Sequence, residues 1–144
     1  MASFIYNQGL LKIANGSIDY LTDDIRALVV NQNYTFDKTH DFVNDVVSFE
    51  LANSTGTGYE RKALANKTVA LVGDVARYDA DDVTYTAVST TQQFGGMVVY
   101  KEGATDSARD LIAFIDFNNI PTNGSDIQIQ FSANGLFRIT NVLS

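Results

Sequence analysis

The stretch MVVYKEGATDSARDLIAFI, residues 97–115, decides the fold. Its two ends, residues 97–100 and 111–115, are apolar at adjacent as well as alternate positions, which is typical of strands covered on both faces. The segment between them, residues 101–110, is polar and predicts a hairpin loop. We therefore expect two central strands here, with the rest of the chain arranged around them.

Shorter β patterns precede this stretch. Residues 25–30 end in a run that is apolar on both faces, and with residues 17–21 they predict a hairpin around a Thr-Asp-Asp turn. From residue 67 to residue 85 the chain alternates β-rich runs with turn residues at 73–74 and 79–82. Several short strands at regular spacing are therefore expected.

The C-terminal part predicts a hairpin of its own. Residues 127–131 alternate apolar and polar side chains, with Gln128 and Gln130 on the polar side, as in a half-buried strand. The Asn-Gly pair at 134–135 is the preferred sequence of a type I′ turn. The chain is then expected to return as a strand over residues 136–143.

Two short helical segments are expected. Residues 6–14 place leucine and isoleucine near helical spacing, and Asn-Gly at 15–16 offers a left-handed stop. Residues 39–46 predict one helical turn, with Thr39 as its cap. Pro121, the only proline, is expected in a connection, because inside a strand it would remove a ladder hydrogen bond.

Length and composition indicate one globular domain over residues 1–144. The 144 residues are 45% hydrophobic and 19% charged, which excludes both a disordered polyelectrolyte and a membrane-embedded chain. No internal repeat or composition break divides them. The predicted fold is mainly β: an antiparallel β-sandwich or flattened barrel with a short N-terminal helix.

Charge and residue content exclude several function classes. Lysine and arginine total 10 against 17 acidic residues, and a net charge of -7 disfavours nucleic acid and anionic membrane surfaces as partners. The absence of cysteine excludes disulfides, and a single histidine excludes the common zinc sites. Because no basic segment precedes the first apolar residues, we expect no signal peptide, so that the chain stays in the compartment where it is made.

A cluster of acidic residues raises the question of a calcium site. Asp79, Asp81 and Asp82 could supply oxygen ligands, but an EF-hand loop counted from Asp79 would need glycine and glutamate where Thr84 and Thr90 stand. Aspartate is also a common turn residue. The pattern favours a solvated turn, with calcium binding as the open alternative.

Other patterns associated with catalysis are incomplete. His40 beside Asp41 could be an oriented base, but no Gly-x-Ser-x-Gly motif supplies a nucleophile. Residues 56–58 read Gly-Thr-Gly, but the rest of a dinucleotide-binding motif is absent. Asp106 and Asp110 are close in sequence, but their spacing alone does not show that the two carboxylates face each other across a cleft. We therefore expect no catalytic residues and no cofactor.

Aromatic residues outside the strongest strands are candidates for surface contacts. Seven tyrosines and nine phenylalanines are present, and most lie on the apolar side of strand patterns, as in a core. Tyr6, Tyr20, Tyr34 and Tyr59 fall outside those patterns. We expect these four at a surface or an interface.

Several motifs follow one another in a fixed order along the chain: GL at 9–10, GSID at 16–19, DIRALV at 24–29, HDF at 40–42, ALANKTV at 63–69, YDADDVT at 78–84, VVYK at 98–101 and LIAFIDF at 111–117. In this order the chain resembles a family of small virion structural proteins of tailed bacteriophages, over nearly its whole length. Tyr85 stands where that family often has tryptophan, which keeps an aromatic packing group. The resemblance implies a non-enzymatic structural role.

Within this family, members are head decoration (cement) proteins or tail components. The acidic charge disfavours a place against packaged DNA and favours the outer head surface. We therefore expect a capsid decoration protein, made in the bacterial cytoplasm, that binds the major capsid protein at capsomer junctions as a homotrimer. The candidate interface residues are Phe4, Tyr6, Gln128 and Gln130. A tail or fibre component, structural or binding host glycans, is the alternative.

Overall fold

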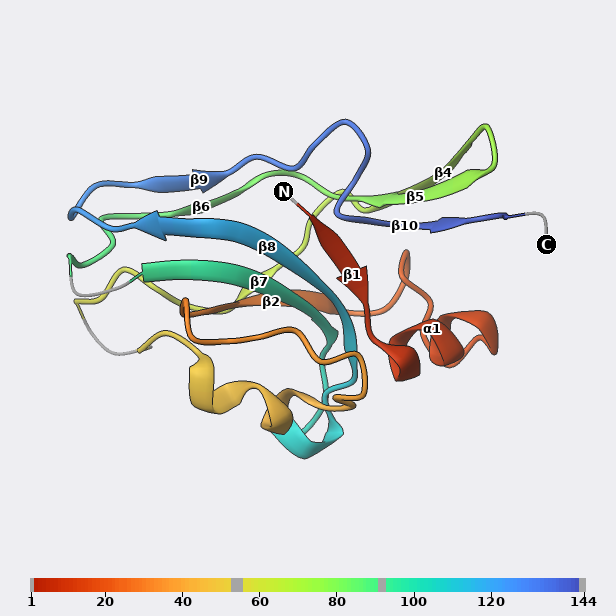
Figure 1. Cartoon of the computed structure of the whole chain (residues 1–144), viewed down its shortest axis with the longest axis horizontal. Coiled ribbons are helices and arrows are strands. Elements are labelled where there is room, and N and C mark those ends of the chain that lie inside the picture. The colour runs from red at the N-terminus through yellow and green to blue at the C-terminus, as the bar shows by residue number, and fades with distance from the viewer. Residues whose placement is uncertain (1, 53–55, 91–92, 143–144) are drawn as a thin grey trace.

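Three antiparallel sheets form the framework of the described residues, with 40% of the chain in strands (Figure 1). The computed structural model describes residues 2–52, 56–90 and 93–142. As predicted, these residues form a mainly β fold with one α-helix near the N-terminus, consistent with a β-sandwich or flattened barrel. The elements are β1 Ser3–Ile5, α1 Asn7–Ala14, β2 Ile25–Val30, η1 Val43–Asp45, η2 Val47–Phe49, β3 Lys62–Ala63, β4 Thr68–Val72, β5 Val75–Asp79, β6 Val83–Tyr85, β7 Gln93–Lys101, η3 Asp106–Ala108, β8 Leu111–Pro121, β9 Ile127–Ile129 and β10 Phe137–Thr140, where η denotes a 3-10 helix.

The central sheet has the strand order β1-β8-β7-β2-β3. Its middle is the predicted pair β7 and β8, joined by the predicted polar loop at 101–110, in which Met97 pairs with Ile115 and Val98 with Phe114. β7 is buried except at its two ends, and β8 is buried over most of residues 111–117, whereas residues 118–121 are more exposed. The prediction of two central strands is confirmed.

Each face of the central sheet belongs to a different hydrophobic core. Met97 and Val99 of β7 point into one core, which we call the first core. Val98 and Tyr100 point into the other, which we call the second core. Such alternation follows from the two-residue repeat of a strand. A sheet that is apolar on both faces needs a cover on each side, and the remaining segments supply these two layers.

The first layer is a long, interrupted ribbon. β5 pairs with β10 through Tyr78 and Phe137, and β6 pairs with β9 through Val83 and Ile129. Residues 75–85 therefore run antiparallel to residues 127–140. This layer is drawn above the central sheet in Figure 1.

The predicted C-terminal hairpin is wrong, because β9 and β10 pair with different strands and not with each other. The loop between them interrupts one side of the ribbon. Gly135 has a φ of 85°, but Asn134 is not left-handed, so no type I′ turn forms. A side chain on residue 135 would also meet the Tyr78 carbonyl oxygen, which lies 2.6 Å from the Cβ position.

The second layer is the segment from 31 to 50, on the opposite face of the sheet. The predicted helical turn within it forms as the two 3-10 helices η1 and η2, from which Val43 and Val46 enter the core. Thr39 is not its cap. The Asp45 carboxylate instead accepts the backbone N–H groups of Asp41 and Phe42, at 2.9 and 3.1 Å.

Two further expectations at strand ends are corrected. Residues 17–21 form no strand, because the Asp23 carboxylate accepts the Asp19 N–H and the Asp19 carboxylate accepts the Leu21 N–H, which closes a turn. Pro121 is the last residue of β8, opposite Gln93, and not part of the following connection. The predicted helix over 6–14 is confirmed as α1, with Gly16 left-handed at φ 81°.

An ion-pair network joins the second layer to the β7–β8 loop. Arg61 contacts Glu50 at 2.7 Å and Asp106 at 2.8 Å, and Arg109 contacts Asp106 at 2.7 Å and also Glu102. Hydrogen bonds from the two guanidinium groups lower the pKa of Asp106 below its usual 3.8. The ionised carboxylate is therefore the form that the fold favours.

We predict that Asp106→Asn lowers stability near neutral pH by at most about 1 kcal/mol, because water screens part of this network. Since the folded-state pKa is depressed, the contribution exists above about pH 4 and is lost as the pH falls through the folded pKa. Urea unfolding from pH 2 to pH 7 should show the two chains converging at the acid end. Asp74→Asn is the control, because Asp74 makes no ion pair within the described residues.

We predict that Phe114→Ala costs about 3 to 5 kcal/mol, because this buried ring packs on Tyr34 and Phe36 and its removal leaves a cavity in the second core. Phe4→Ala, which removes a ring that is 42% exposed on the neighbouring strand, should cost clearly less. Urea unfolding measures both. Equal losses would contradict the central position of Phe114.

Candidate functional site

The four candidate interface residues do not form one surface. Phe4 is exposed on β1, as expected. Gln128 and Gln130 are also exposed, but they lie on and beside β9 in the other layer. Tyr6 is fully buried, so its assignment to the surface is wrong. Its side chain enters the second core because it alternates with Ile5 at the end of β1.

The other tyrosines expected at a surface are also buried. Tyr20 and Tyr59 are each 3% exposed and Tyr34 is 8% exposed. Their hydroxyls find partners inside the fold: Tyr20 donates to the Asp79 carbonyl at 3.0 Å, and Tyr59 to Glu50 at 2.8 Å. Loops that cover a two-sided sheet carry core residues, so a position outside a strand does not imply exposure here.

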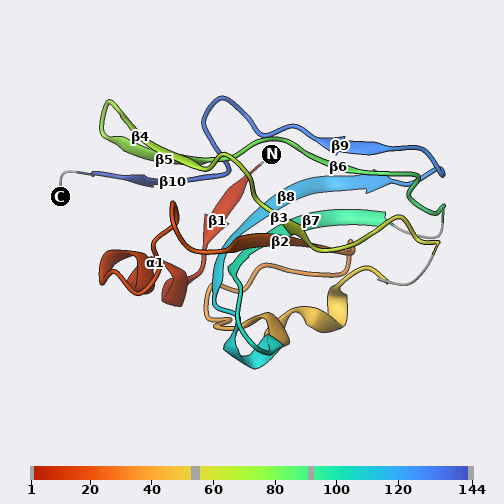
Figure 2. The same cartoon turned by 180° about the vertical axis from the view of Figure 1, so that it is seen from behind.

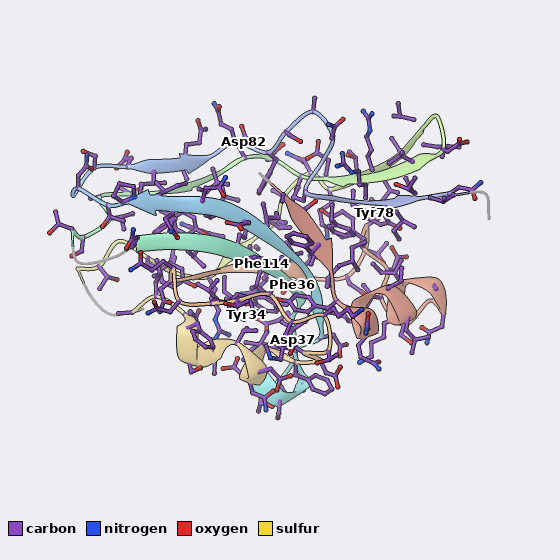
Figure 3. All side chains as sticks on the ribbon, viewed as in Figure 1. Tyr34, Phe36, Asp37, Tyr78, Asp82 and Phe114 are labelled. Atoms are coloured by element: carbon purple, nitrogen blue, oxygen red, sulfur yellow. The ribbon has the colours of Figure 1, made fainter. Side chains whose placement is uncertain are left out.

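Aromatic rings gather where the second layer packs on β1 and β8. Phe36 stacks on Phe114 with ring centroids 5.9 Å apart and on Phe4 at 5.1 Å, and Tyr34 meets Phe49 at 5.4 Å. Figure 3 shows Tyr34, Phe36 and Phe114 close together, with Asp37 beside them. The candidate Phe4 thus belongs to this cluster.

An open groove of about 670 Å³ lies against these rings. We call it the aromatic–acid groove. Its aromatic and ionisable lining residues are Tyr34, Phe36, Asp37, Lys38, His40, Asp45 and Phe49. Hydrogen bonds from the hydroxyl and the N–H of Thr39 lower the pKa of Asp37, so this exposed carboxylate is held in its charged form. Rings and carboxylates together suit a ligand with a flat cationic or polyhydroxyl group.

A chain of hydrogen bonds leads from the core to this groove. The Tyr6 hydroxyl lies 2.8 Å from the Tyr34 hydroxyl, which lies 3.1 Å from His40 Nδ1. Burial, together with the neighbouring phenol, raises the pKa of Tyr6, and burial also raises that of Tyr34. Both phenols therefore stay neutral, and His40 has the role of a hydrogen-bond partner.

The acidic turn at the β5–β6 corner holds its carboxylates apart. Asp79 accepts the Ala80 N–H, Asp81 accepts Asn66 Nδ2 at 2.6 Å, and Asp82 accepts the Phe131 N–H. Within the described residues no group of three His, Cys, Asp or Glu could hold a metal ion. These three aspartates therefore act as turn and ribbon contacts, and nothing in their geometry favours the calcium alternative.

The other catalytic candidates are placed in structural contacts. Asp106 is part of the ion-pair network, and Asp110 pairs with Lys12 of α1 at 2.5 Å. Gly56 and Gly58 are both left-handed, in a loop whose residues 53–55 lie outside the described part of the chain. None of the helices in the described ranges is long and apolar enough to cross a bilayer.

A second candidate surface, which the sequence analysis did not identify, is the sheet β10-β5-β4. We call this sheet the arm, because it projects from the body beyond the central strands (Figures 1 and 2). Every residue of its edge strand β4 is exposed, and Leu71 near the hairpin tip is 77% exposed. The pattern of 68–72 resembles that of a buried strand, so only the place of β4 at the free edge of the arm reveals its exposure.

Comparison with protein-family models, with curated proteins and with solved structures finds no match to this chain.

We predict that Tyr34→Phe destabilises the fold by about 1 to 3 kcal/mol, because it leaves the buried Tyr6 hydroxyl without its partner. The matched control is Tyr85→Phe. The Tyr85 hydroxyl is buried without a hydrogen-bond partner among the described residues, so its removal should be neutral or stabilising. Thermal and urea unfolding compare the two. Equal effects would remove the role assigned to the Tyr6–Tyr34 hydrogen bond.

Proposed function

We propose that this chain is a non-enzymatic virion structural protein of a tailed bacteriophage, a decoration protein on the outer surface of the head that binds the major capsid protein as a homotrimer. The observation that carries the proposal is the arm, whose apolar tip is exposed: Leu71 and Val72 are 77% and 45% exposed. Apolar groups gathered on a projecting element fit a protein contact better than they fit solvent.

The arrangement of acidic residues supports a structural role. The carboxylates weighed as catalytic candidates make ion pairs or accept backbone N–H groups. They fasten loops to the sheet, as a shell protein that must remain rigid requires. The order of motifs from 9 to 117, which resembles small phage virion proteins, supplies the location, and the net charge of -7 favours the outside of the head.

A tail or fibre component that binds host glycans is the second candidate. The aromatic–acid groove favours it, because rings beside carboxylates are a common way to hold sugar rings and hydroxyls. In that case the groove is the functional surface and the arm serves only assembly.

We predict that the purified chain rebinds emptied, expanded phage heads at a fixed copy ratio, and that Leu71→Ser weakens this rebinding by about tenfold or more. Val47→Ser is the matched control, because Val47 is an exposed valine on η2, in the opposite layer. Sedimentation of heads with bound protein measures the copy number.

Each result separates the candidates. Loss of binding in Leu71→Ser with retention in Val47→Ser supports the decoration role. A wild-type chain that does not bind heads, but binds tails or host oligosaccharides, rejects that role in favour of the second candidate.

A further inference from the structure

Two arginines on the arm lack acidic partners. Arg77 of β5 and Arg138 of β10 are directly opposite each other in the register, so they lie on the same face of the arm. Neither makes an ion pair within the described residues. Like charges opposite each other in a sheet are destabilising, so the pair weakens the isolated chain.

Arg77 is incompletely bonded as well. Its Nε is buried without a hydrogen-bond partner in the part of the chain that the structure describes, and its one hydrogen bond, to the Ala133 carbonyl, is 3.4 Å long. A guanidinium group offers five donors in a flat fork that matches a carboxylate. Arg77 thus has an unsatisfied Nε donor, and its register position places it on the same face of the arm as the exposed Arg138.

Among the arginines of the described residues, only these two make no ion pair. The other three arginines, Arg26, Arg61 and Arg109, each contact carboxylates at the surface or in the network. Residues 67–79 and 137–142, which include the arm, carry three cationic and two acidic side chains, a net charge of +1. The rest of the chain therefore carries -8. The arm is a cationic element on an acidic body.

The aromatic–acid groove has the complementary chemistry. Asp37 and Asp45 supply two exposed carboxylates against the single lysine, Lys38, so the groove stays acidic. Phe36 and Phe49 supply partly buried ring faces. A guanidinium group stacks on an aromatic ring while it bonds a carboxylate. In Figures 1 and 2 the arm and the segment 33–49 lie at opposite sides of the molecule, so the two surfaces do not meet within one copy.

We propose that Arg77 and Arg138 of one copy dock into the aromatic–acid groove of a second copy of this chain, in a head-to-tail contact. Such a contact uses two different surfaces of each copy, and it closes into a ring when the rotation between copies allows. The inference rests on the proposed decoration role in that it supplies the interface of the homotrimer. A two-fold contact between arms is disfavoured, because it would bring four guanidinium groups together.

The test uses two variants, each of which disables one side of the contact. The arm variant carries Arg77→Gln with Arg138→Glu, and the groove variant carries Asp37→Asn with Asp45→Asn, where each asparagine retains an oxygen for the local hydrogen bonds of the loop and of the cap at η1. Light scattering should show the wild-type chain as a multiple of 15.8 kDa and each variant alone at the mass of one chain. A one-to-one mixture of the variants should form dimers and nothing larger, because it retains one intact contact per pair.

Controls keep the outcome interpretable. Lys62→Glu reverses a partly exposed cation on β3, away from both surfaces, and should retain the wild-type mass. Circular dichroism checks that each variant is folded, and Arg138→Glu alone, at an exposed position, should still raise the dissociation constant by about tenfold or more. Rising salt should weaken the wild-type assembly.

Three results would overturn the inference: a wild-type chain that stays monomeric at millimolar concentration, folded variants that keep the wild-type mass, or a mixture of folded variants that stays monomeric. Head rebinding is a separate measurement. Rings that form in solution but do not bind heads would reject the proposed function and leave the head-to-tail contact standing.

Discussion

The structure depends on one constraint, that the β7–β8 pair is apolar on both faces. Met97 and Val99 face one core while Val98 and Tyr100 face the other, so neither side of the central sheet can be left to water. Burial of this kind is the main favourable contribution to folding. The ribbon formed by β5, β6, β9 and β10 covers one face and the segment 31–50 covers the other. Most other features follow from how these two layers are fastened.

The sequence predicts the central sheet well because its signal is local. A strand buried on both faces shows a continuous apolar run, as at 111–115, and a left-handed stop such as Gly16 shows as glycine after a helical pattern. Strand partners are not a local property. Residues 127–131 alternate as predicted, yet β9 pairs with β6, because the interrupted ribbon places its pairing some forty residues away in sequence. The same limit explains why Tyr34 and Tyr59 are expected at a surface and are in fact buried. Their burial depends on which part of the sheet their loops cover.

The candidate groove is a consequence of how the second layer is built. That layer has only short 3-10 helices, so aromatic rings supply most of its packing area against Phe114. Rings of this size reach from the core to the surface, and Phe36 is buried on one side and open on the other. The hydrogen bonds from Tyr6 through Tyr34 to His40 hold the floor of the groove in one geometry. Packing and recognition therefore use the same side chains, which is why no separate motif marks the site in the sequence.

The arm poses the opposite problem at its edge strand β4, which no other described segment covers. β4 is an edge strand of uncharged residues, TVALV, without proline or bulge, and such edges promote pairing with other chains unless something blocks them. Charge is available nearby, but it lies on β5 and β10 as Arg77 and Arg138, on the outer face and not along the free edge. Arginines at these positions cannot block another chain from pairing with the edge of β4. They do favour an approaching surface that is negatively charged. The arm therefore combines a free strand edge with two arginines that make no ion pair. Such a surface attracts acidic partners and repels the arms of other copies. The acidic body of a second copy is a partner of this kind.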